Sequence, residues 1–326
     1  MVNVLMLSKW HVHAEGYAKT VAAQPDARVY KVWDDDTTRG ETWAKDLGVP
    51  FEADLGKALA DPEVNAVVVD TPTSDHRRVM LAAAEAGKHI FTEKALATTL
   101  ADCRAIAEAV KKNGVKFCIS HPQLTTPFVQ YCKQSIDDGS IGKIHYMRMR
   151  SAHSGSLAGW LPAYWYDLEK AGGGAMMDLG CHPMYTAAYL LGKPKRIASI
   201  FNTNYAPPNV DDNSVSVVEF ENKAIAVLET SFVSPYQADC IEVLGTEGAI
   251  TQVGGVVKVR SEKKLADGWF TPDKLPPQQP TAIRQWLDGI IDNAPIAFDV
   301  DMGIALTELL ENAYISDREQ KIVKII

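Results

Sequence analysis

The stretch from Gly172 to Pro183 holds two side chains that are suited to acid–base chemistry. Asp178 and His182 are four residues apart, a spacing that puts both side chains on one face of a helix. A carboxylate beside an imidazole can hold a proton acceptor in one orientation. The stretch begins with three glycines, which lack a Cβ and let the backbone pass close to another body. A glycine turn before a helix whose histidine only packs explains the same residues.

The turn from Ser8 to His13 follows the first apolar run, where a dinucleotide site normally begins with G-x-G-x-x-G. Here the turn reads Ser-Lys-Trp-His-Val-His, and none of the glycine positions is kept. The second apolar run ends in Asp34, Asp35 and Asp36, where a carboxylate would bind a ribose 2′-hydroxyl and repel a 2′-phosphate. These acids favour NAD over NADP as cofactor, but a solvated acidic turn would contain the same residues.

His11 and His13 also suggest a metal site, because residues i and i+2 of a strand or loop point the same way. Asp178, Cys181 and His182 lie far along the chain, and no further ligand cluster appears at a metal-site spacing. We therefore expect no catalytic metal.

Short apolar runs alternate with helix-compatible segments up to about residue 120, which predicts a parallel sheet covered on both faces. Ligands of such sheets bind at the carboxyl ends of the strands. The expected strands are 2–7, 28–33, a short one near Val49, 64–69, 89–92 and 115–119. The expected helices lie before Ala23 and over 39–47, 54–60, 74–86 and 98–112.

After residue 120 the pattern changes to an α+β domain with a mostly antiparallel sheet. Strands are expected at 143–150, 196–203, 214–220, 224–232, 239–244, 249–253, 256–260 and 321–326. Helices are expected at 125–138, from the glycines to Leu191, and at 282–292 and 300–316, with an exposed loop over 262–280. A single TIM barrel is the competing architecture, but consecutive hairpins do not fit eight βα units. The predicted domains are 1–120 and 121–326.

Composition limits the class of protein. The net charge of −8 over 326 residues argues against nucleic-acid binding. No apolar run is as long as a membrane-spanning helix, and Val4 to Leu7 is too short for a signal-peptide core. Five scattered cysteines without a CxxC pair suit a reducing cytoplasm and give no zinc framework. We expect a soluble, cytoplasmic protein that does not bind membranes.

Several separate motifs resemble one known family. Thr71 to His76 (T-P-T-S-D-H) and Ala84 to Lys94 (A-E-A-G-K-H-I-F-T-E-K) are similar to a signature of the Gfo/Idh/MocA oxidoreductases, T-P-N-x-x-H followed by A-G-K-H-V-x-x-E-K-P. The glycine stretch resembles the G-G-G-x-x-x-D-x-G-x-H of that family, and Leu244 to Ala249 resembles its late sheet turn. The matches span the chain in the expected order, which makes them far more specific together than singly.

The resemblance implies a nicotinamide-binding Rossmann domain and an α+β domain with a large open sheet, with the substrate held between them. It implies Lys94, Asp178 and His182 as the catalytic residues. The implied cofactor contacts are Ser8, Trp10 and His11 at the diphosphate, Asp34 and Asp35 at the adenosine ribose, Thr71, Pro72 and His76 at the nicotinamide, Glu93 at its ribose, and Lys94 and Gln123. The open sheet needs covering, so we expect a homodimer or homotetramer through it.

The chain departs from the family pattern at two places besides the glycine-free loop. Ala95 stands where the family has proline after the lysine. His121-Pro122-Gln123 stands where many members have asparagine and arginine, so the substrate or nicotinamide contacts there must differ. We expect His121 to contact substrate.

An aromatic segment precedes the glycine stretch, and flat rings with polar edges suit the apolar face of a sugar. Its candidate substrate residues are Trp160, Tyr164 and Trp165, with Asp167 or His153 binding hydroxyls. Core packing or a subunit contact would explain the aromatic cluster equally well.

The resulting expectation is an NAD(P)-dependent oxidoreductase that moves a hydride between nicotinamide and a secondary alcohol or ketone of a sugar or polyol. Three other functions stay open. They are a glycosidase that retains NAD, a non-catalytic dinucleotide sensor, and, last, a metal-dependent hydrolase.

Overall fold

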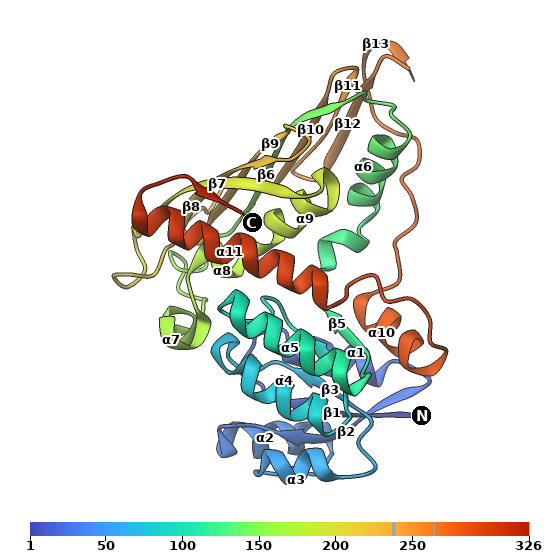
Figure 1. The fold of residues 1–326 in the computed structure, drawn as a ribbon, viewed down its shortest axis with the longest axis vertical. Helices are drawn as coiled ribbons and strands as arrows, with labels where there is room; N and C mark the ends of the chain where they lie inside the picture. The colour runs from blue at the N-terminus through green and yellow to red at the C-terminus, as the bar shows by residue number, and fades with distance from the viewer. Residues whose placement is uncertain (237–238, 264, 326) are drawn as a thin grey trace. The chain divides into compact units, whose positions relative to one another are not determined.

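The computed structural model describes residues 1–236, 239–263 and 265–325 (Figure 1). These residues form two compact units, each with its own sheet. The first unit contains 1–120 and 280–307, and the second contains 121–279 and 308–326. The sequence-based boundaries instead gave 280–307 to the second domain.

The sheet of the first unit is parallel throughout, as predicted, in the order β2-β1-β3-β4-β5. Its strands are β1 (Val2–Leu7), β2 (Ala27–Trp33), β3 (Ala66–Val69), β4 (His89–Thr92) and β5 (Phe117–Ile119). Every residue of β1 and β3 is buried, which explains why their sequences are apolar except for Asn3. The predicted strand near Val49 is wrong, because Phe51 forms only an isolated bridge with Val32.

Several helices of the first unit begin at a side-chain cap. The helices of this unit are α1 (Ala14–Ala22), α2 (Thr37–Leu47), α3 (Leu55–Ala60), α4 (His76–Glu85), α5 (Leu100–Asn113) and α10 (Ala282–Ile291), with a 3₁₀ turn η1 (Thr73–Asp75). The side chains of Asp36, Asp54 and Thr99 cap α2, α3 and α5. Helix α10 packs on β4 and β5, where Trp286 is fully buried beside Phe91. That apolar contact is why 280–307 joins the first unit.

The second unit is built on a sheet of order β13-β12-β11-β10-β6-β9-β8-β7-β14. Its strands are β6 (Ile144–Ala152), β7 (Pro194–Asn202), β8 (Asn213–Phe220), β9 (Ile225–Ser231), β10 (Cys240–Gly245), β11 (Gly248–Val253), β12 (Val256–Ser261), β13 (Leu265–Phe270) and β14 (Val323–Lys324). All its pairings are antiparallel except β6 with β9. This confirms the mostly antiparallel sheet, but β13 lies in the stretch that was predicted to be a loop.

The helical segments of this unit are η2 (Pro122–Thr125), α6 (Pro127–Asp137), η3 (Ala163–Tyr166), α7 (Leu168–Ala171), α8 (Ala175–Asp178) and α9 (Cys181–Leu191). Helix α11 (Val300–Glu319) begins in residues of the first unit and ends in the second. The single helix predicted after the glycines is therefore two helices. The break falls at Leu179 and Gly180, where the Cβ of any other residue would meet Met176.

No helix among the described residues is both long and apolar enough to cross a membrane.

Candidate functional site

The carboxyl edge of the parallel sheet is lined by buried polar residues. One follows each strand directly, and the five are Ser8, Asp34, Asp70, Glu93 and Ser120, each at most 5% exposed. Polar side chains are rarely buried unless they have partners, so a row of them marks a place built for polar ligands. This edge is where parallel α/β sheets bind their ligands.

The loop after β1 makes its turn without glycine. Ser8 has φ 74°, in the left-handed region that glycine favours, at a cost of about 1–2 kcal/mol. Its hydroxyl accepts the amide N–H of Trp10 at 3.1 Å and contacts Asp34 at 3.2 Å. Trp10 and His11 are buried at 4% and 5% exposure. The loop leads straight into α1, and helix N-termini attract phosphate groups.

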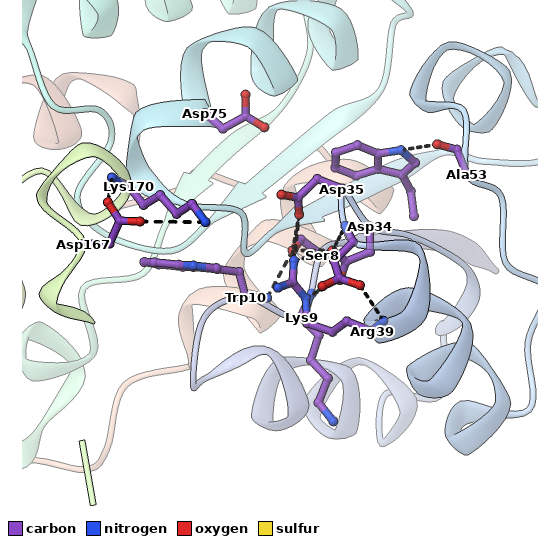
Figure 2. Close-up of polar contacts among 12 residues, drawn as sticks. Ser8, Lys9, Trp10, Asp34, Asp35, Arg39, Ala53, Asp75, Asp167 and Lys170 are labelled. Carbon is purple, nitrogen blue, oxygen red and sulfur yellow. Dashed lines mark hydrogen bonds and ion pairs between the residues drawn. The ribbon is translucent and has the colours of Figure 1, made fainter. Parts of the chain in front are cut away.

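The acidic end of β2 forms a closed ion cluster (Figure 2). Arg39 donates to both oxygens of Asp34, with Nε at 3.0 Å from Oδ2, and to Asp35 at 2.7 Å. The amide N–H groups of Lys9 and Asp36 also donate to Asp34, at 2.8 and 3.0 Å. Burial alone would raise the pKa of Asp34, but these donors hold it below its ordinary value. Two carboxylates against one guanidinium leave net negative charge, which opposes a 2′-phosphate.

The turn after β3 contains buried polar atoms that have no hydrogen-bond partner among the described residues. Among the described residues, neither carboxylate oxygen of Asp70 nor the hydroxyl of Thr71 has a hydrogen-bond partner, and both residues are buried. Burial, and then the nearby Glu93, raise the pKa of Asp70 well above its ordinary value. Unsatisfied buried groups are costly, so this turn fits a ligand that supplies donors and acceptors.

His76, the first residue of α4, contacts this turn through its ring. Its Nδ1 lies 3.1 Å from the carbonyl oxygen of Leu96 and its Nε2 lies 3.2 Å from that of Thr71. A neutral imidazole has one N–H, so only one of the two contacts is a hydrogen bond at a time. Burial lowers the pKa of His76, which favours the neutral ring. The ring thus ties the Thr71-Pro72 turn to the segment after Lys94, and Pro72 begins η1 beside it.

The end of β4 carries Glu93 and Lys94, which are 2% and 4% exposed. The Tyr17 hydroxyl lies between the carboxylate of Glu93 and the hydroxyl of Ser120, and His13 Nδ1 lies 3.3 Å from Glu93 Oε2. Burial alone would raise the pKa of Glu93, but His11, His13 and Lys94 hold it far below its ordinary value. The peptide bond between Lys94 and Ala95 is cis.

In the second unit, one buried carboxylate organises the glycine stretch. Asp211 accepts the amide N–H of Gly174 at 2.9 Å and that of Met176 at 2.7 Å. The hydroxyl of Tyr314 donates to Asp211 at 2.8 Å and accepts the amide N–H of Gly174 at 3.0 Å. A Cβ on Gly174 would lie 2.0 Å from the carbonyl oxygen of Asp211, so only glycine fits. This network fixes the start of α8, which ends at Asp178.

The imidazole of His182 is oriented by a tyrosine one helical turn later. His182 Nδ1 lies 2.7 Å from the hydroxyl of Tyr185, which accepts the amide N–H of Gln123 at 3.2 Å. The Tyr185 ring stacks on His121, with centroids 4.2 Å apart. His121 and Tyr185 are buried, whereas His182 and Gln123 are half-buried. His121 thus packs against the tyrosine that contacts His182. Gln123 contacts the same tyrosine through its backbone N–H group.

Asp178 lies within electrostatic range of His153. Burial lowers the pKa of His153, and Asp178 opposes that shift. The His153 ring stacks on Phe232 at 5.1 Å and lies 4.6 Å from the ring of Trp160. Trp160 is 57% exposed, an unusual position for an indole. The structure therefore brings together three of the predicted substrate residues, Asp178, His153 and Trp160.

The rest of the aromatic segment serves local structure. Trp165 is 6% exposed and packs in the core, with the half-buried Tyr164 beside it. The side chain of Asp167 accepts the amide N–H groups of Glu169 and Lys170 and so caps α7. Packing thus explains Tyr164 and Trp165, and helix capping explains Asp167, without a contact to substrate.

Sequence reasoning missed several residues of these networks, among them Tyr17, Arg39, Tyr185, Asp211 and Tyr314. Tyr185 could have been found, because i+3 spacing from His182 puts it on the same helix face. Asp211 lies 37 residues after Gly174, and Tyr17 lies 76 residues before Glu93. No spacing rule reports contacts at that separation.

Two family models match the chain. The model of the GFO/IDH/MocA oxidoreductase family with an NAD-binding Rossmann fold matches residues 12–121, and the model of the GFO/IDH/MocA C-terminal domain matches residues 129–251.

Characterised relatives share this likeness. The chain is 34% identical over 247 residues to scyllo-inositol 2-dehydrogenase (NAD(+)) of Bacillus subtilis, covering 74% of this chain and 69% of that protein. It is 29% identical over 245 residues to 2,7-anhydro-N-acetylneuraminate hydratase of Mediterraneibacter gnavus, covering 72% of this chain and 64% of that protein.

Solved structures have the same fold. GenD2 from gentamicin A biosynthesis, in complex with NAD, aligns over 100% of this chain and 96% of its own, with a TM-score of 0.85 and 26% identity. Levoglucosan dehydrogenase in complex with NADH and L-sorbose aligns over 100% and 99%, with a TM-score of 0.89 and 21% identity. Both family models, the inositol dehydrogenase relative and the shared fold agree that the chain belongs to the Gfo/Idh/MocA family of NAD-binding oxidoreductases.

Proposed function

We propose that the protein oxidises a secondary alcohol of a sugar or polyol, or reduces the corresponding ketone, with NAD(H) as the redox partner. The observation that carries this proposal is the row of buried polar residues at the carboxyl edge of the parallel sheet, with unsatisfied oxygen atoms at Asp70 and Thr71. When bound, NAD supplies the hydride acceptor, and the protein supplies binding, orientation and charge.

We propose that the two units contribute different groups to the reaction. Lys94, as an ammonium, stabilises the negative charge that develops on the alcohol oxygen, and such electrostatic stabilisation is usually the largest single catalytic effect. His182 accepts the hydroxyl proton at Nε2, since Nδ1 faces the Tyr185 hydroxyl. Histidine is the side chain most often used as a proton acceptor in enzymes near neutral pH.

The tyrosine contact sets the tautomer that this role requires. For Nε2 to accept a proton, Nδ1 of His182 must carry the ring hydrogen and donate it to the Tyr185 oxygen, 2.7 Å away. The Tyr185 oxygen, which also accepts from Gln123, has a second lone pair for this bond. Tyr185 is therefore proposed as a positioning residue, and Asp178, beside His153, as a binding residue for a substrate hydroxyl.

Two observations support a polyhydroxylated substrate, and a third supports NAD as the cofactor. Exposed Trp160 beside His153 offers a flat apolar surface with a polar edge, which suits a sugar ring. The inositol dehydrogenase and levoglucosan dehydrogenase relatives have polyol and sugar names, although the levoglucosan enzyme of Pseudarthrobacter phenanthrenivorans matches over only 57% of its length at 29% identity. Asp34 and Asp35 oppose a 2′-phosphate, which supports NAD.

The experiment that tests the proposal is a screen of inositols, aldoses and anhydrosugars with NAD and with NADP, following the absorbance of the reduced cofactor. The proposal expects NADH formation with at least one polyol and a kcat/KM at least about 10-fold higher with NAD than with NADP, a difference of about 1.4 kcal/mol. Absence of reduced cofactor with every compound, together with no NAD binding by calorimetry, would contradict it.

A second candidate is a reaction in which NAD is oxidised and reduced within one turnover, as in a glycosidase that retains its cofactor. The likeness to two 2,7-anhydro-N-acetylneuraminate hydratases favours it, since their names describe no net redox change. Glycosides or anhydrosugars consumed without accumulation of NADH would support this candidate over net dehydrogenation.

A further inference from the structure

Three potential metal ligands meet at the carboxyl edge of the parallel sheet. One ring nitrogen each of His11 and His13 and one carboxylate oxygen of Glu93 all lie within 4.8 Å of one another. The two imidazole rings are 4.7 Å apart between centroids. Both histidines are in the loop after β1, and Glu93 directly follows β4, which lies two strands away in the sheet. The sheet therefore joins ligands that are 80 residues apart in sequence.

The surroundings of this cluster include a second buried carboxylate, Asp70, to which no described residue donates a hydrogen bond. Glu93 is 2% exposed, and Asp70 is fully buried with both carboxylate oxygens lacking a hydrogen-bond partner among the described residues. The two carboxylates are close enough to interact electrostatically. Buried carboxylates are costly unless they are paired or coordinate a metal, so a divalent cation at the cluster would lower the cost of burying Asp70 beside Glu93.

We propose that His11, His13 and Glu93 bind one divalent transition-metal ion, with Zn²⁺ as the first candidate. Two imidazoles and one carboxylate are a donor set that Zn²⁺ prefers and that Mg²⁺ and Ca²⁺ do not. Metal–ligand distances of about 2.0–2.2 Å require ligand atoms roughly 3.3–3.6 Å apart in a tetrahedral site. The ligand atoms lie within 4.8 Å of one another, so movements of about 1 Å would bring the cluster to that spacing, with water as the fourth ligand.

The three ligands divide into a fixed part and a movable part. Glu93 is buried beside the hydroxyl of Tyr17, and His11 is buried in the loop. The side chain of His13 is 51% exposed and provides the route by which an ion enters. His11 Nδ1 accepts the amide N–H of His13 at 3.2 Å. A metal on either nitrogen of His11 breaks that contact, because Nδ1 must then hold the ion or the ring proton.

The test measures metal binding alone, because His11 and Glu93 are also proposed cofactor contacts. Untagged protein, stripped with EDTA and free of NAD, is titrated with Zn²⁺ by calorimetry, and Co²⁺ absorbance then reports the coordination. The proposal expects one Zn²⁺ per chain and an affinity at least about 100-fold lower in His13→Ala, since even outer-shell changes cost 10–100-fold. The matched control is His145→Ala, an exposed histidine on β6, which should bind Zn²⁺ as the wild type does.

The His13→Ala variant decides the outcome, because the half-exposed side chain of His13 can be removed without opening the core. Glu93→Gln is a second variant, to be used if it folds. Circular dichroism checks the fold of each. Equal Zn²⁺ affinity in wild type and His13→Ala, or no binding by the wild type, would overturn the proposal. Neither result would affect the proposed oxidoreductase function, which is tested by formation of reduced cofactor in metal-free buffer.

Discussion

At the scale of single residues, the site depends on how buried charges are compensated. Asp34 is compensated by Arg39 and two backbone amides, and Glu93 by two imidazoles and Lys94. Asp70 has no such partner among the described residues. Burial favours a raised pKa in all three acids, but the partners of Asp34 and Glu93 outweigh burial and lower their pKa values, whereas the pKa of Asp70 stays well above its ordinary value. Each case leads to a different expectation for mutation.

Asp35 should control the choice between NAD and NADP. Its side chain is 43% exposed and adds a second carboxylate beside Arg39, which Asp34 already neutralises. Asp35→Ser removes one negative charge, so the affinity for NADP should rise by about 5- to 10-fold, or about 1 kcal/mol, with little change for NAD. Calorimetric titration with both cofactors measures this. Asp46→Ser, which removes a surface acid at a distance along α2, is the control, and an equal rise there would contradict a local role.

Asp70 should make stability depend on pH with a defined sign. Its pKa is near 3.9 in the unfolded chain and well above that in the folded protein, so the folded state binds the extra proton. The wild type should therefore lose stability as pH rises above about 4, and Asp70→Asn should remove that loss. Urea unfolding at pH 4.5 and 7.5 should show the variant gaining relative to wild type at the higher pH. A difference that stays constant between the two values would contradict the raised pKa.

At the scale of elements, short helices carry two of the proposed catalytic residues, and a buried network positions the first of these helices. The glycine stretch, α8 and α9 hold Asp178 and His182, while Asp211 and Tyr314 fix where α8 begins. The spacing of Asp178 and His182 was visible in sequence. The role of Asp211 was not, because it depends on contacts with residues 35 and 37 positions earlier in the chain.

Gly174 should tolerate no side chain, even alanine. A Cβ there would lie 2.0 Å from the carbonyl oxygen of Asp211 and 2.8 Å from its amide nitrogen. Gly174→Ala should lower the free energy of unfolding by about 2–4 kcal/mol, because the backbone network must separate. Gly16→Ala is the matched control, since Gly16 lies in α1 with nothing within 4 Å of the added Cβ. That variant should be neutral or more stable by up to about 1 kcal/mol. Equal stability of the two variants would refute the network.

Sequence patterns recovered most elements because their signals are local. The largely apolar runs of β1 and β3 and the caps at Asp36 and Thr99 are decided by neighbours in the chain. Helix α10 was located, but its membership of the first unit follows from Trp286 packing near Phe91, a contact over nearly 200 positions. The Ser8–His13 loop was read as lacking a nucleotide signal, and its turn is made by a serine in a left-handed conformation. A sequence pattern does not report packing between distant residues or a left-handed backbone conformation at a residue other than glycine.

At the scale of the whole molecule, the sheet of the second unit has a face on which apolar side chains are exposed. Residues of β8 alternate, with Ser214, Ser216 and Val218 buried and Val215 and Val217 exposed at 40% each. Ser199 and Ser216 bond each other on the buried face, where Ser316 of α11 also bonds. The opposite face forms a groove lined by Ala198, Ile200, Val215, Val217 and Ile322. Exposed apolar patches of this kind mark interfaces, so we propose a homodimer or homotetramer through this sheet.

A charge on that face should separate the subunits. Val217→Glu puts a carboxylate in the middle of the apolar patch, and burying it in an interface would cost several kcal/mol. Light scattering should give the mass of one chain for this variant and a multiple of 35.7 kDa for the wild type. Lys258→Glu, on the exposed side of β12, is the control and should leave the mass unchanged. A monomeric wild type would contradict the proposed interface.

The measurement that tests the central claim most directly is a double-mutant cycle on Lys94 and His182, with kcat/KM for the best polyol and NAD as the readout. Each alanine variant should lose about 10²-fold or more in kcat/KM while NAD affinity stays within about 2-fold. The double variant should lose much less than the product of the two single losses, because both groups serve one proton and hydride transfer. Full activity in either single variant, or losses that simply multiply, would contradict a shared catalytic role.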